Sequence, residues 1–298
     1  MDTAPLSNWW WGMALWGAIF SAGQMIVAGH FKVDGLHLSW LRCVLVVVLL
    51  TPFMVLYMHW PTDPRFYIAV VEAGILATVA DAIAMNSSAR FGAGVTSRLL
   101  PAAPVMGFFL WCAMHPHEQL GKLTSNPIIG AGIVLALMGC VLALSRLRAS
   151  PVSRQALALL APVIFLYGLN DTLNKTAQMH APFGYGQIAY IYVICMTVSL
   201  CGALWMLTRG TLPNLHSNPR LVRAAGLIVA CYLLAMVGRN FAMFFTLNPG
   251  YVSIIGNTAP VMVFLWHKLR GEQDTANPRA GFAFVGCAAL LVWLVNHL

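Results

Sequence analysis

Charged side chains are scarce in this 298-residue chain. Asp, Glu, Lys and Arg together make up 9% of the residues, whereas 59% are hydrophobic. A soluble domain of this size could not cover its surface with so little charge. Apolar runs of helical length follow one another almost to the end of the sequence. The composition therefore excludes a soluble globular protein and predicts a multi-pass membrane protein in contact with the lipid bilayer.

Several motifs that carry chemistry are also missing. The sequence has no HExxH, no CxxC and no GxxxxGK[ST], so it lacks common signals of zinc proteases, redox dithiols and nucleotide-binding loops. His115, His117 and Glu118 resemble metal ligands, but their place at a polar break favours a surface polar group. We therefore expect no cofactor and no metal ion. An intramembrane enzyme is the less favoured alternative to a carrier driven by a gradient or by exchange.

The basic residues do not form a nucleic-acid surface. The formal net charge is +8, but Lys and Arg stand singly or in pairs between apolar runs, without a cluster interleaved with aromatic residues. We therefore expect no nucleic-acid partner. Their distribution instead bears on how the chain crosses the membrane.

Ten apolar runs are long enough to cross a bilayer, since about 20 helical residues span its core. Polar breaks such as Asn126-Pro127, Asn248-Pro249 and Asn277-Pro278 separate them. The longest polar gaps, 145–154 and 208–220, are too short for a soluble domain, so the function should lie within the membrane. The predicted spans are 9–29, 37–58, 67–86, 94–114, 127–145, 156–177, 185–207, 223–247, 250–267 and 280–296.

A repeated tetrapeptide divides the chain into two halves. Ala103-Pro104-Val105-Met106 recurs 156 residues later as Ala259-Pro260-Val261-Met262, and Leu15-Trp16-Gly17 matches Leu166-Tyr167-Gly168. Each half holds five spans, an odd number, so the second half must enter the membrane from the opposite side. The expected fold is an all-α membrane protein of ten transmembrane helices, built as two inverted five-helix repeats (1–147 and 148–298). Chance similarity between apolar segments is the alternative.

The order of short motifs in both halves resembles the drug/metabolite transporter superfamily, and more closely its EamA-type, ten-span branch. The resemblance implies a helix bundle with a central cavity, which exchanges small solutes across the bacterial inner membrane and most often exports amino acids or related metabolites. Glu118 departs from the pattern, because it follows His117 where the family usually has glycine. The matching residues are Trp16-Gly17, Arg42, Pro104-Val105, Glu118, Gly132, Gly139, Gly168, Pro260-Val261, Gly271-Glu272, Gly281 and Gly286.

The loops differ strongly in basic residues. Loops after even-numbered spans hold Arg65 and Lys122, with Lys175 near a third. The positive-inside rule therefore predicts cytoplasmic odd-numbered loops and external termini, whereas the family pattern implies cytoplasmic termini. The two predictions of orientation disagree. Loops after odd-numbered spans hold Lys32, Arg90, Arg146, Arg148, Arg154, Arg209, Arg220, Arg223, Lys268, Arg270 and Arg279.

Ionisable side chains inside the spans are the main candidates for function, because a charge at membrane depth is costly unless it is paired or hydrated. Asp81 and Arg98 should lie at similar depth on neighbouring antiparallel helices, and Gln24 and Arg42 fall in the same half of the membrane. We interpret them as a hydrated vestibule for an anionic group of a substrate. An Asp81–Arg98 ion pair that only joins two helices is the alternative.

The second half offers a corresponding polar layer. Its sixth span has a polar face, which should point into the bundle. Asp171 is the strongest candidate for binding a coupling proton. The alternative is an Asp171–Lys175 pair in which Lys175 reaches toward the interface. The layer consists of Asn170, Asp171, Asn174, Lys175 and Gln178 on the sixth span, Arg239 on the eighth and Asn257 on the ninth.

Prolines and aromatic residues complete the predicted site. Pro104 and Pro260 lie inside spans, where proline bends a helix, so they are candidate hinges or simply static kinks. Trp16, Tyr167, Tyr190 and Tyr192 are candidate cavity-lining residues, although packing or interfacial anchoring is the commoner role of aromatic residues in spans.

Together these features predict a carrier for a small metabolite, with an amino acid or a relative as the favoured substrate, working by alternating access as a monomer or homodimer. A proton or a counter-substrate would be the second ligand. Asp171 and Asp81 are assigned to coupling, Arg239, Arg98 and Arg42 to anionic groups. Asn257, Asn170, Gln24 and Trp16 complete the predicted substrate site. A flippase for lipid-linked substrates is the alternative transporter.

Overall fold

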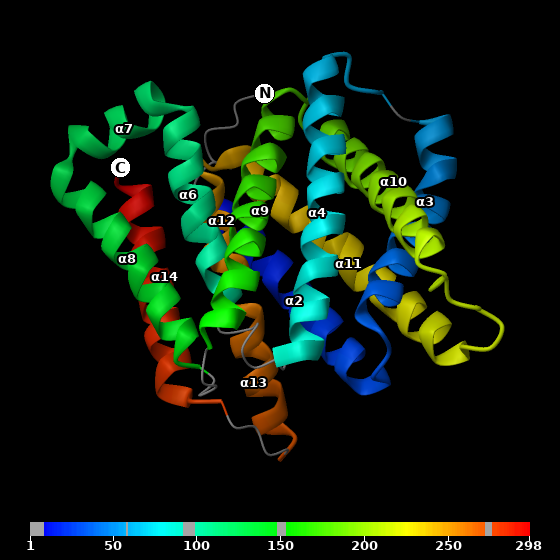
Figure 1. Cartoon of the computed structure of the whole chain (residues 1–298). Helices are drawn as coiled ribbons and strands as arrows, with labels where there is room; N and C mark the ends of the chain where they lie inside the picture. The colour runs from blue at the N-terminus through cyan, green and yellow to red at the C-terminus, as the bar shows by residue number, and fades with distance from the viewer. Residues whose placement is uncertain (1–8, 58, 92–98, 148–152, 272–275) are drawn as a thin grey trace.

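The computed structural model describes residues 9–57, 59–91, 99–147, 153–271 and 276–298 (Figure 1). All regular structure in these residues is helical, and eight of their helices are long and apolar enough to cross a membrane. The predicted multi-pass, all-α architecture is thus present. The elements are α2 (Trp10–Phe31), α3 (Gly35–Leu56), α4 (Pro64–Phe91), η1 (Leu100–Ala102), α6 (Ala103–Met114), α7 (Pro116–Ser125), α8 (Pro127–Ser145), α9 (Arg154–Met179), α10 (Tyr185–Thr208), α11 (Pro219–Phe245), α12 (Pro249–Gly256), α13 (Ala259–Leu269) and α14 (Pro278–Asn296).

Two predicted spans are not continuous helices. The ninth is divided into α12 and α13 by a break at Asn257 and Thr258. The described part of the fourth consists of the 3-10 turn η1 followed by the 12-residue α6. The polar break after the fourth span also contains an unpredicted helix, the 10-residue α7. The described chain therefore combines eight long helices with shorter ones, and the prediction of ten spans is not confirmed.

Asparagine–proline pairs mark where four helices begin. In each pair the asparagine side chain accepts a hydrogen bond from a backbone N–H two or three residues further on, at 2.9–3.4 Å. The proline that follows occupies the first turn, where its missing N–H leaves no helical hydrogen bond unmade. Three of these starts were predicted as polar breaks. The pairs are Asn126-Pro127, Asn218-Pro219, Asn248-Pro249 and Asn277-Pro278.

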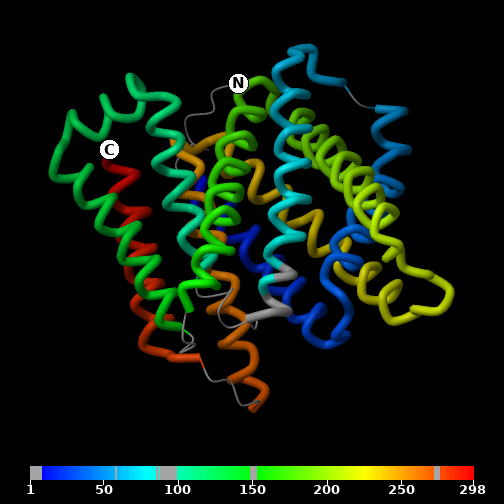
Figure 2. Tube along the Cα trace, in the orientation of Figure 1, coloured from blue at the N-terminus to red at the C-terminus, as the bar shows by residue number. Residues whose placement is uncertain are grey.

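The helices pack in pairs drawn from different halves of the sequence. α2 packs along α11, α4 along α9, α3 against α10, and α8 against α14 (Figures 1 and 2). Glycines allow the closest approaches. A Cβ at Gly238 of α11 would lie 2.7 Å from the Met13 carbonyl oxygen on α2, and one at Gly168 of α9 would lie 2.8 Å from the Gly107 nitrogen on α6. Larger side chains at these positions would push the helices apart.

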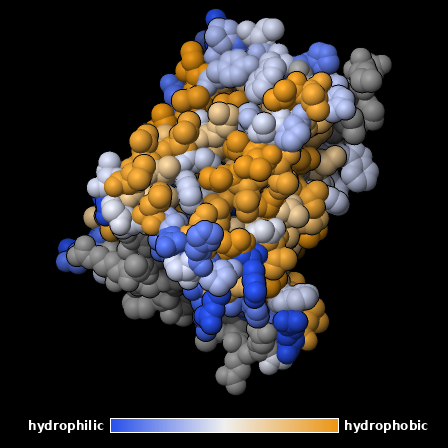
Figure 3. Space-filling view, turned by 90° about the vertical axis from the view of Figure 1, so that its right-hand side faces the viewer, coloured by the Kyte–Doolittle hydropathy of each residue, from blue (hydrophilic) through white to orange (hydrophobic). Residues whose placement is uncertain are grey.

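The outer surface is suited to lipid contact. Many large apolar side chains face outward, among them Ile128, Leu135 and Phe282. Figure 3 shows apolar side chains covering the middle of one face, with hydrophilic ones gathered toward its ends. An apolar band between two hydrophilic ends is the surface that helices crossing a bilayer present to lipid.

A surface hydrogen bond joins two loops at the end of the bundle. The Nδ1 atom of His180, which follows α9, lies 2.8 Å from Oδ2 of Asp63, which precedes α4. Asp63 also accepts a hydrogen bond from the backbone N–H of Arg65 at 2.9 Å. This backbone bond, followed by the contact with His180, lowers the pKa of Asp63 below its ordinary value.

Candidate functional site

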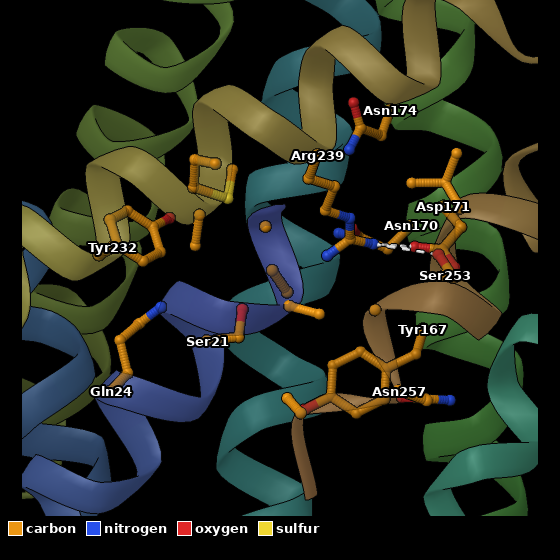
Figure 4. A pocket seen from close by; sticks show the side chains of 18 of the residues that line it. Ser21, Gln24, Tyr167, Asn170, Asp171, Asn174, Tyr232, Arg239, Ser253 and Asn257 are labelled. Atoms are coloured by element: carbon orange, nitrogen blue, oxygen red, sulfur yellow. Dashed lines mark hydrogen bonds and ion pairs between the residues drawn. The ribbon is translucent and has the colours of Figure 1, made fainter. Parts of the chain in front are cut away.

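A cavity of about 440 Å³ lies between the packed helices of the two halves (Figure 4). Residues from α2, α3, α4 and α6 meet residues from α9, α10, α11, α12 and α13 around it. Its polar lining is unusual for a chain this apolar, because polar groups inside a membrane protein carry a desolvation cost. The polar lining residues are Ser21, Gln24, Ser39, Arg42, Asp81, Tyr167, Asn170, Asp171, Asn174, Tyr190, Tyr232, Arg239, Ser253 and Asn257.

An ion pair between Arg239 and Asp171 forms one pole of the cavity. Arg239 Nη2 donates to Asp171 Oδ1, and the same nitrogen lies 3.5 Å from Oγ of Ser253 (Figure 4). Asp171 is 5% exposed, whereas the Arg239 side chain is 39% exposed. The guanidinium therefore presents a free face to the cavity, while the carboxylate is enclosed by α9 and its neighbours.

Lys175 is not the partner of Asp171, which corrects the alternative considered from the sequence. Its ammonium donates to the carbonyl oxygens of Met243 (2.7 Å) and Phe244 (3.3 Å) near the end of α11. Lys175 is only 7% exposed, so its ammonium is held inside the protein and does not reach water. The buried carbonyls satisfy the ammonium in place of water, and Asp171 is left to pair with Arg239.

The predicted polar face of α9 does point into the bundle. Asn174 and Gln178 are almost fully buried, like Asp171. Gln178 Nε2 lies 3.5 Å from Oδ1 of Asn174, and Gln187 Nε2 donates to Oε1 of Gln178 at 3.0 Å. Gln187 in turn accepts from the backbone N–H of Gly184 at 2.6 Å. A line of buried amides thus connects the cavity wall with the loop between α9 and α10.

Arg42 forms the second pole. Its Nη1 donates to Oε1 of Gln24 at 3.2 Å and its Nη2 to Oγ of Ser39 at 2.9 Å. The guanidinium carbon lies 4.0 Å from the centre of the Tyr232 ring, which is a cation–π geometry. In the described part of the chain, no carboxylate lies within ion-pair distance of Arg42. Neutral groups therefore hold this cation in place.

Asp81 lines the same cavity and accepts a 2.6 Å hydrogen bond from the hydroxyl group of Tyr167. This bond joins α4 to α9 at cavity level. The predicted partner Arg98 lies outside the described residues, so the Asp81–Arg98 pair stays a prediction. Tyr167 was considered from the sequence only as a possible cavity aromatic, and its position fits that idea.

The structure brings most of the predicted site residues to one place. The predicted residues Trp16, Lys175, Gln178 and Tyr192 do not line the cavity. Trp16 is 47% exposed and packs against Phe20, with ring centres 4.9 Å apart. The Trp16 ring instead lies beside α11: a Cβ at Gly238 would be 2.8 Å from Trp16 Cδ1. The predicted residues that do line the cavity are Gln24, Arg42, Asp81, Asn170, Asp171, Arg239, Asn257, Pro104 and Pro260.

Asn170 and Asn257 both line the cavity, but their side-chain amides differ in hydrogen bonding. Asn170 Nδ2 donates to the carbonyl oxygen of Ala73 on α4 at 2.6 Å, so this amide already joins two helices. Asn257 Nδ2 has no hydrogen-bond partner among the described residues. Ser253 and Tyr232 were not predicted. Serine and tyrosine are common in apolar spans, so nothing in the sequence distinguishes these two from other polar residues.

Both copies of the repeated tetrapeptide begin a helix at the cavity. Ala103 and Pro104 start α6, Ala259 and Pro260 start α13, and all four residues line the cavity. Each proline therefore lies in a first turn, where it removes no helical hydrogen bond, and not in the middle of a continuous helix. The sequence predicted a bend inside each span, whereas each proline lies in the first turn of a helix that follows the turn η1 or the break at Asn257 and Thr258.

Comparison of the sequence with family models and with curated proteins found no match. The resemblance to the drug/metabolite transporter superfamily therefore stays a prediction based on the residues. Within the described residues, no three or more His, Cys, Asp or Glu side chains are grouped so that they could hold a metal ion. The chemistry that the cavity offers is binding through two guanidinium groups, two carboxyl groups and neutral hydrogen-bonding groups.

Proposed function

We propose that the protein is a secondary transporter that moves a small polar or amphipathic metabolite across a bacterial inner membrane by alternating access. An amino acid or a relative is the favoured substrate, and export the favoured direction. The observation that carries the proposal is the 440 Å³ cavity, which is lined by charged residues from both halves of an apolar helix bundle. Such a cavity fits a solute of metabolite size, and its charged groups would have little use in a purely structural bundle.

The pairing of helices supports the proposed two-repeat architecture of the EamA type. The first predicted span packs along the eighth (α2 with α11), and the sixth along the third (α9 with α4). Exchanging the two halves converts one pair into the other. The matched helix starts at Pro104 and Pro260 fit the same exchange. Two interchangeable halves would give two nearly equivalent conformations, one open to each side.

Each polar group has a proposed role. Arg239 and Arg42, together with Arg98, would bind anionic groups of the substrate, while Asp171 and Asp81 would bind a proton or a cation. Neutral hydrogen bonds would come from the amides that line the cavity. Pro104 and Pro260 would allow α6 and α13 to change direction at their first turns.

Counterflow in proteoliposomes tests the proposal. Vesicles preloaded with an unlabelled amino-acid mixture should accumulate labelled members of that mixture only when they contain the protein. Arg42→Gln should reduce the initial rate at least about tenfold, because a lost charge-assisted bond is worth about 1.5–3 kcal/mol. Arg154→Gln is the matched control, since Arg154 is exposed at the start of α9 and outside the cavity.

Equal rates in the Arg42→Gln and Arg154→Gln variants would contradict a substrate role for the cavity. Chemical conversion of the solutes in detergent, without flux in vesicles, would instead favour an intramembrane enzyme.

A further inference from the structure

In the ion pair between Arg239 and Asp171, the carboxylate holds a place on the guanidinium that an anionic ligand could take. Arg239 faces the cavity, and its buried Nε atom has no hydrogen-bond partner among the described residues. Asp171 holds one side of the guanidinium from the enclosed wall on α9. A guanidinium can bind a carboxylate through two parallel N–H groups, and only Nη2 is engaged with Asp171. Part of the binding capacity of Arg239 is therefore unused.

We propose that Arg239 and Asp171 form a partner-exchange site, at which an anionic group of the transported solute replaces Asp171 on Arg239 while Asp171 takes up one proton. This inference rests on the proposed transport function and states how the solute binds in the cavity. The ion pair between Arg239 and Asp171 breaks, an ion pair between Arg239 and the solute forms, and an O–H bond forms on the Asp171 carboxylate. The proton comes from water on the side to which the cavity is open.

The surroundings of Asp171 explain why a proton must accompany the anion. α11 contributes Arg239, and α12 contributes the neutral Ser253. α6 brings Gly107 close, since a Cβ there would lie 3.4 Å from the Asp171 Cβ, and the helix carries no charged side chain. Lys175, one turn further along α9, is already bound to carbonyl oxygens. No second described cation is in place to replace Arg239.

The remaining neighbours also lack a replacement cation. α4 brings Asp81, a second carboxyl group, which is bonded to Tyr167 of α9 itself. α10 brings Tyr190, which is neutral, and Arg42 of α3 is held by its own neutral partners. A carboxylate enclosed as tightly as Asp171 is strongly disfavoured without a cation, so neutralisation by a proton is the lower-energy outcome.

Tyr190 supplies a second, independent observation. Its side chain is fully buried on α10 and lines the cavity, yet its hydroxyl group has no hydrogen-bond partner among the described residues. It lies close enough to Asp171 and Arg239 to interact electrostatically with both. An unpaired buried hydroxyl group is costly and therefore uncommon. Its oxygen can accept a hydrogen bond from Asp171 once that residue is protonated and has left Arg239.

The exchange has a definite charge balance. Before loading, the pair contributes one positive and one negative charge. After a monoanion has bound, Arg239 and the anion contribute the same two charges, and protonated Asp171 contributes none. The loaded and empty cavities therefore carry equal charge, and one anion crosses together with one proton. An inward proton gradient would drive uptake, so export would require a larger opposing gradient of the solute.

Acetate, the smallest simple carboxylate probe, tests the exchange on the purified protein. In weakly buffered solution, a pH-indicator dye should report uptake of about one proton for each acetate bound. Infrared difference spectra should show a new C=O band of a protonated carboxylic acid. Between about pH 8 and about pH 6, acetate affinity should rise about tenfold per pH unit, as linkage to one proton requires. These measurements use the wild-type protein, so they do not depend on a variant that folds.

Variants then identify the carboxyl group. Asp171→Asn should bind acetate without proton uptake and with an affinity independent of pH. Tyr190→Phe should bind it less tightly than wild type at the lower pH. In the control variant Asp63→Asn, which changes a carboxyl group outside the cavity, proton uptake should persist. Failure of acetate to bind, binding without proton uptake, or proton uptake that survives in Asp171→Asn would each overturn the proposal.

The outcome can be separated from that of the proposed function. Counterflow of amino acids that does not vary with pH, together with acetate binding without protons, would remove the exchange and leave transport standing. Proton-linked acetate binding without any flux would leave the exchange standing and remove transport.

Discussion

The two arginines of the cavity are held in different ways. Arg239 is bonded to the carboxylate of Asp171, whereas Arg42 is bonded to an amide and a hydroxyl group and lies over the ring of Tyr232. The charge of Arg239 is therefore balanced by direct contact. The charge of Arg42 has no such partner among the described residues.

This difference shows how one residue type can serve two purposes in one cavity. Neutral partners fix the position of Arg42 and leave its charge available. At Arg239 the carboxylate of Asp171 balances the charge, so we expect that charge to become available to a ligand only when Asp171 is protonated. Variants that change one of the two arginines at a time can therefore separate the effect of its position from the effect of its charge.

The largest effect is expected at the ion pair. Arg239→Ala leaves the Asp171 carboxylate buried without its cation, which should lower the free energy of unfolding by about 3 kcal/mol. The loss should be greater at about pH 8 than at about pH 5, because protonation relieves the unpaired charge. Unfolding by a denaturing detergent, followed by circular dichroism, measures it. The double variant Arg239→Ala/Asp171→Asn should recover much of the loss, and no recovery would show that the ion pair is not the cause.

Removal of the other arginine should cost less. Arg42→Ala removes two hydrogen bonds to neutral groups and one cation–π contact, for a loss of about 2 kcal/mol. No described carboxylate lies within ion-pair distance, so this loss should vary less with pH than that of Arg239→Ala in the same unfolding assay. A pH dependence as large as that of Arg239→Ala would erase the distinction between the two poles.

A smaller effect is expected where Tyr167 meets Asp81. Tyr167→Phe removes the 2.6 Å hydrogen bond and keeps the ring, so the free energy of unfolding should fall by about 1–2 kcal/mol. In the Asp81→Asn background the same change should cost less, because the bond is no longer made to a carboxylate. A double-mutant cycle measures the coupling, and an energy near zero would mean that the bond contributes nothing.

The smallest effect concerns the exposed pair at the end of the bundle. The pKa of Asp63 is lowered by the backbone N–H of Arg65 and by His180. Its contribution to stability is thus complete above the ordinary value of 3.8 and is lost as the pH falls through the lower folded value. The melting temperature of wild type should fall slightly more than that of Asp63→Asn between about pH 5 and about pH 3. Equal slopes would show that Asp63 carries none of the acid sensitivity.

The sequence predicted where the helices lie better than it predicted where a helix is interrupted. Length and hydropathy located the eight long helices, and α8 has the predicted bounds 127–145. The interruption at Asn257 was missed because apolar composition continues through it, from α12 into α13. Hydropathy measures how well a segment suits lipid. It does not report whether the backbone hydrogen bonds run through the segment without a break.

The sequence predicted how deep the site residues lie in the membrane, but not which way their side chains point. Counting residues from the span ends placed Asp171 and Arg239 at similar depth, and the structure joins them. It did not show that Arg239, rather than Lys175, faces Asp171, because that depends on how α9 and α11 are rotated about their axes. Trp16 shows the same limit, since its side chain packs beside Gly238 of α11 and does not line the cavity.

The two helices that start at the cavity are short, with 12 residues in α6 and 11 in α13. At about 1.5 Å per residue, each covers roughly half of a hydrocarbon core about 30 Å thick. In a bilayer, an ion that enters the cavity from either face would then cross only part of the electric field. Its entry would respond to voltage by roughly 1 kcal/mol per 100 mV, about half of the full value for a unit charge.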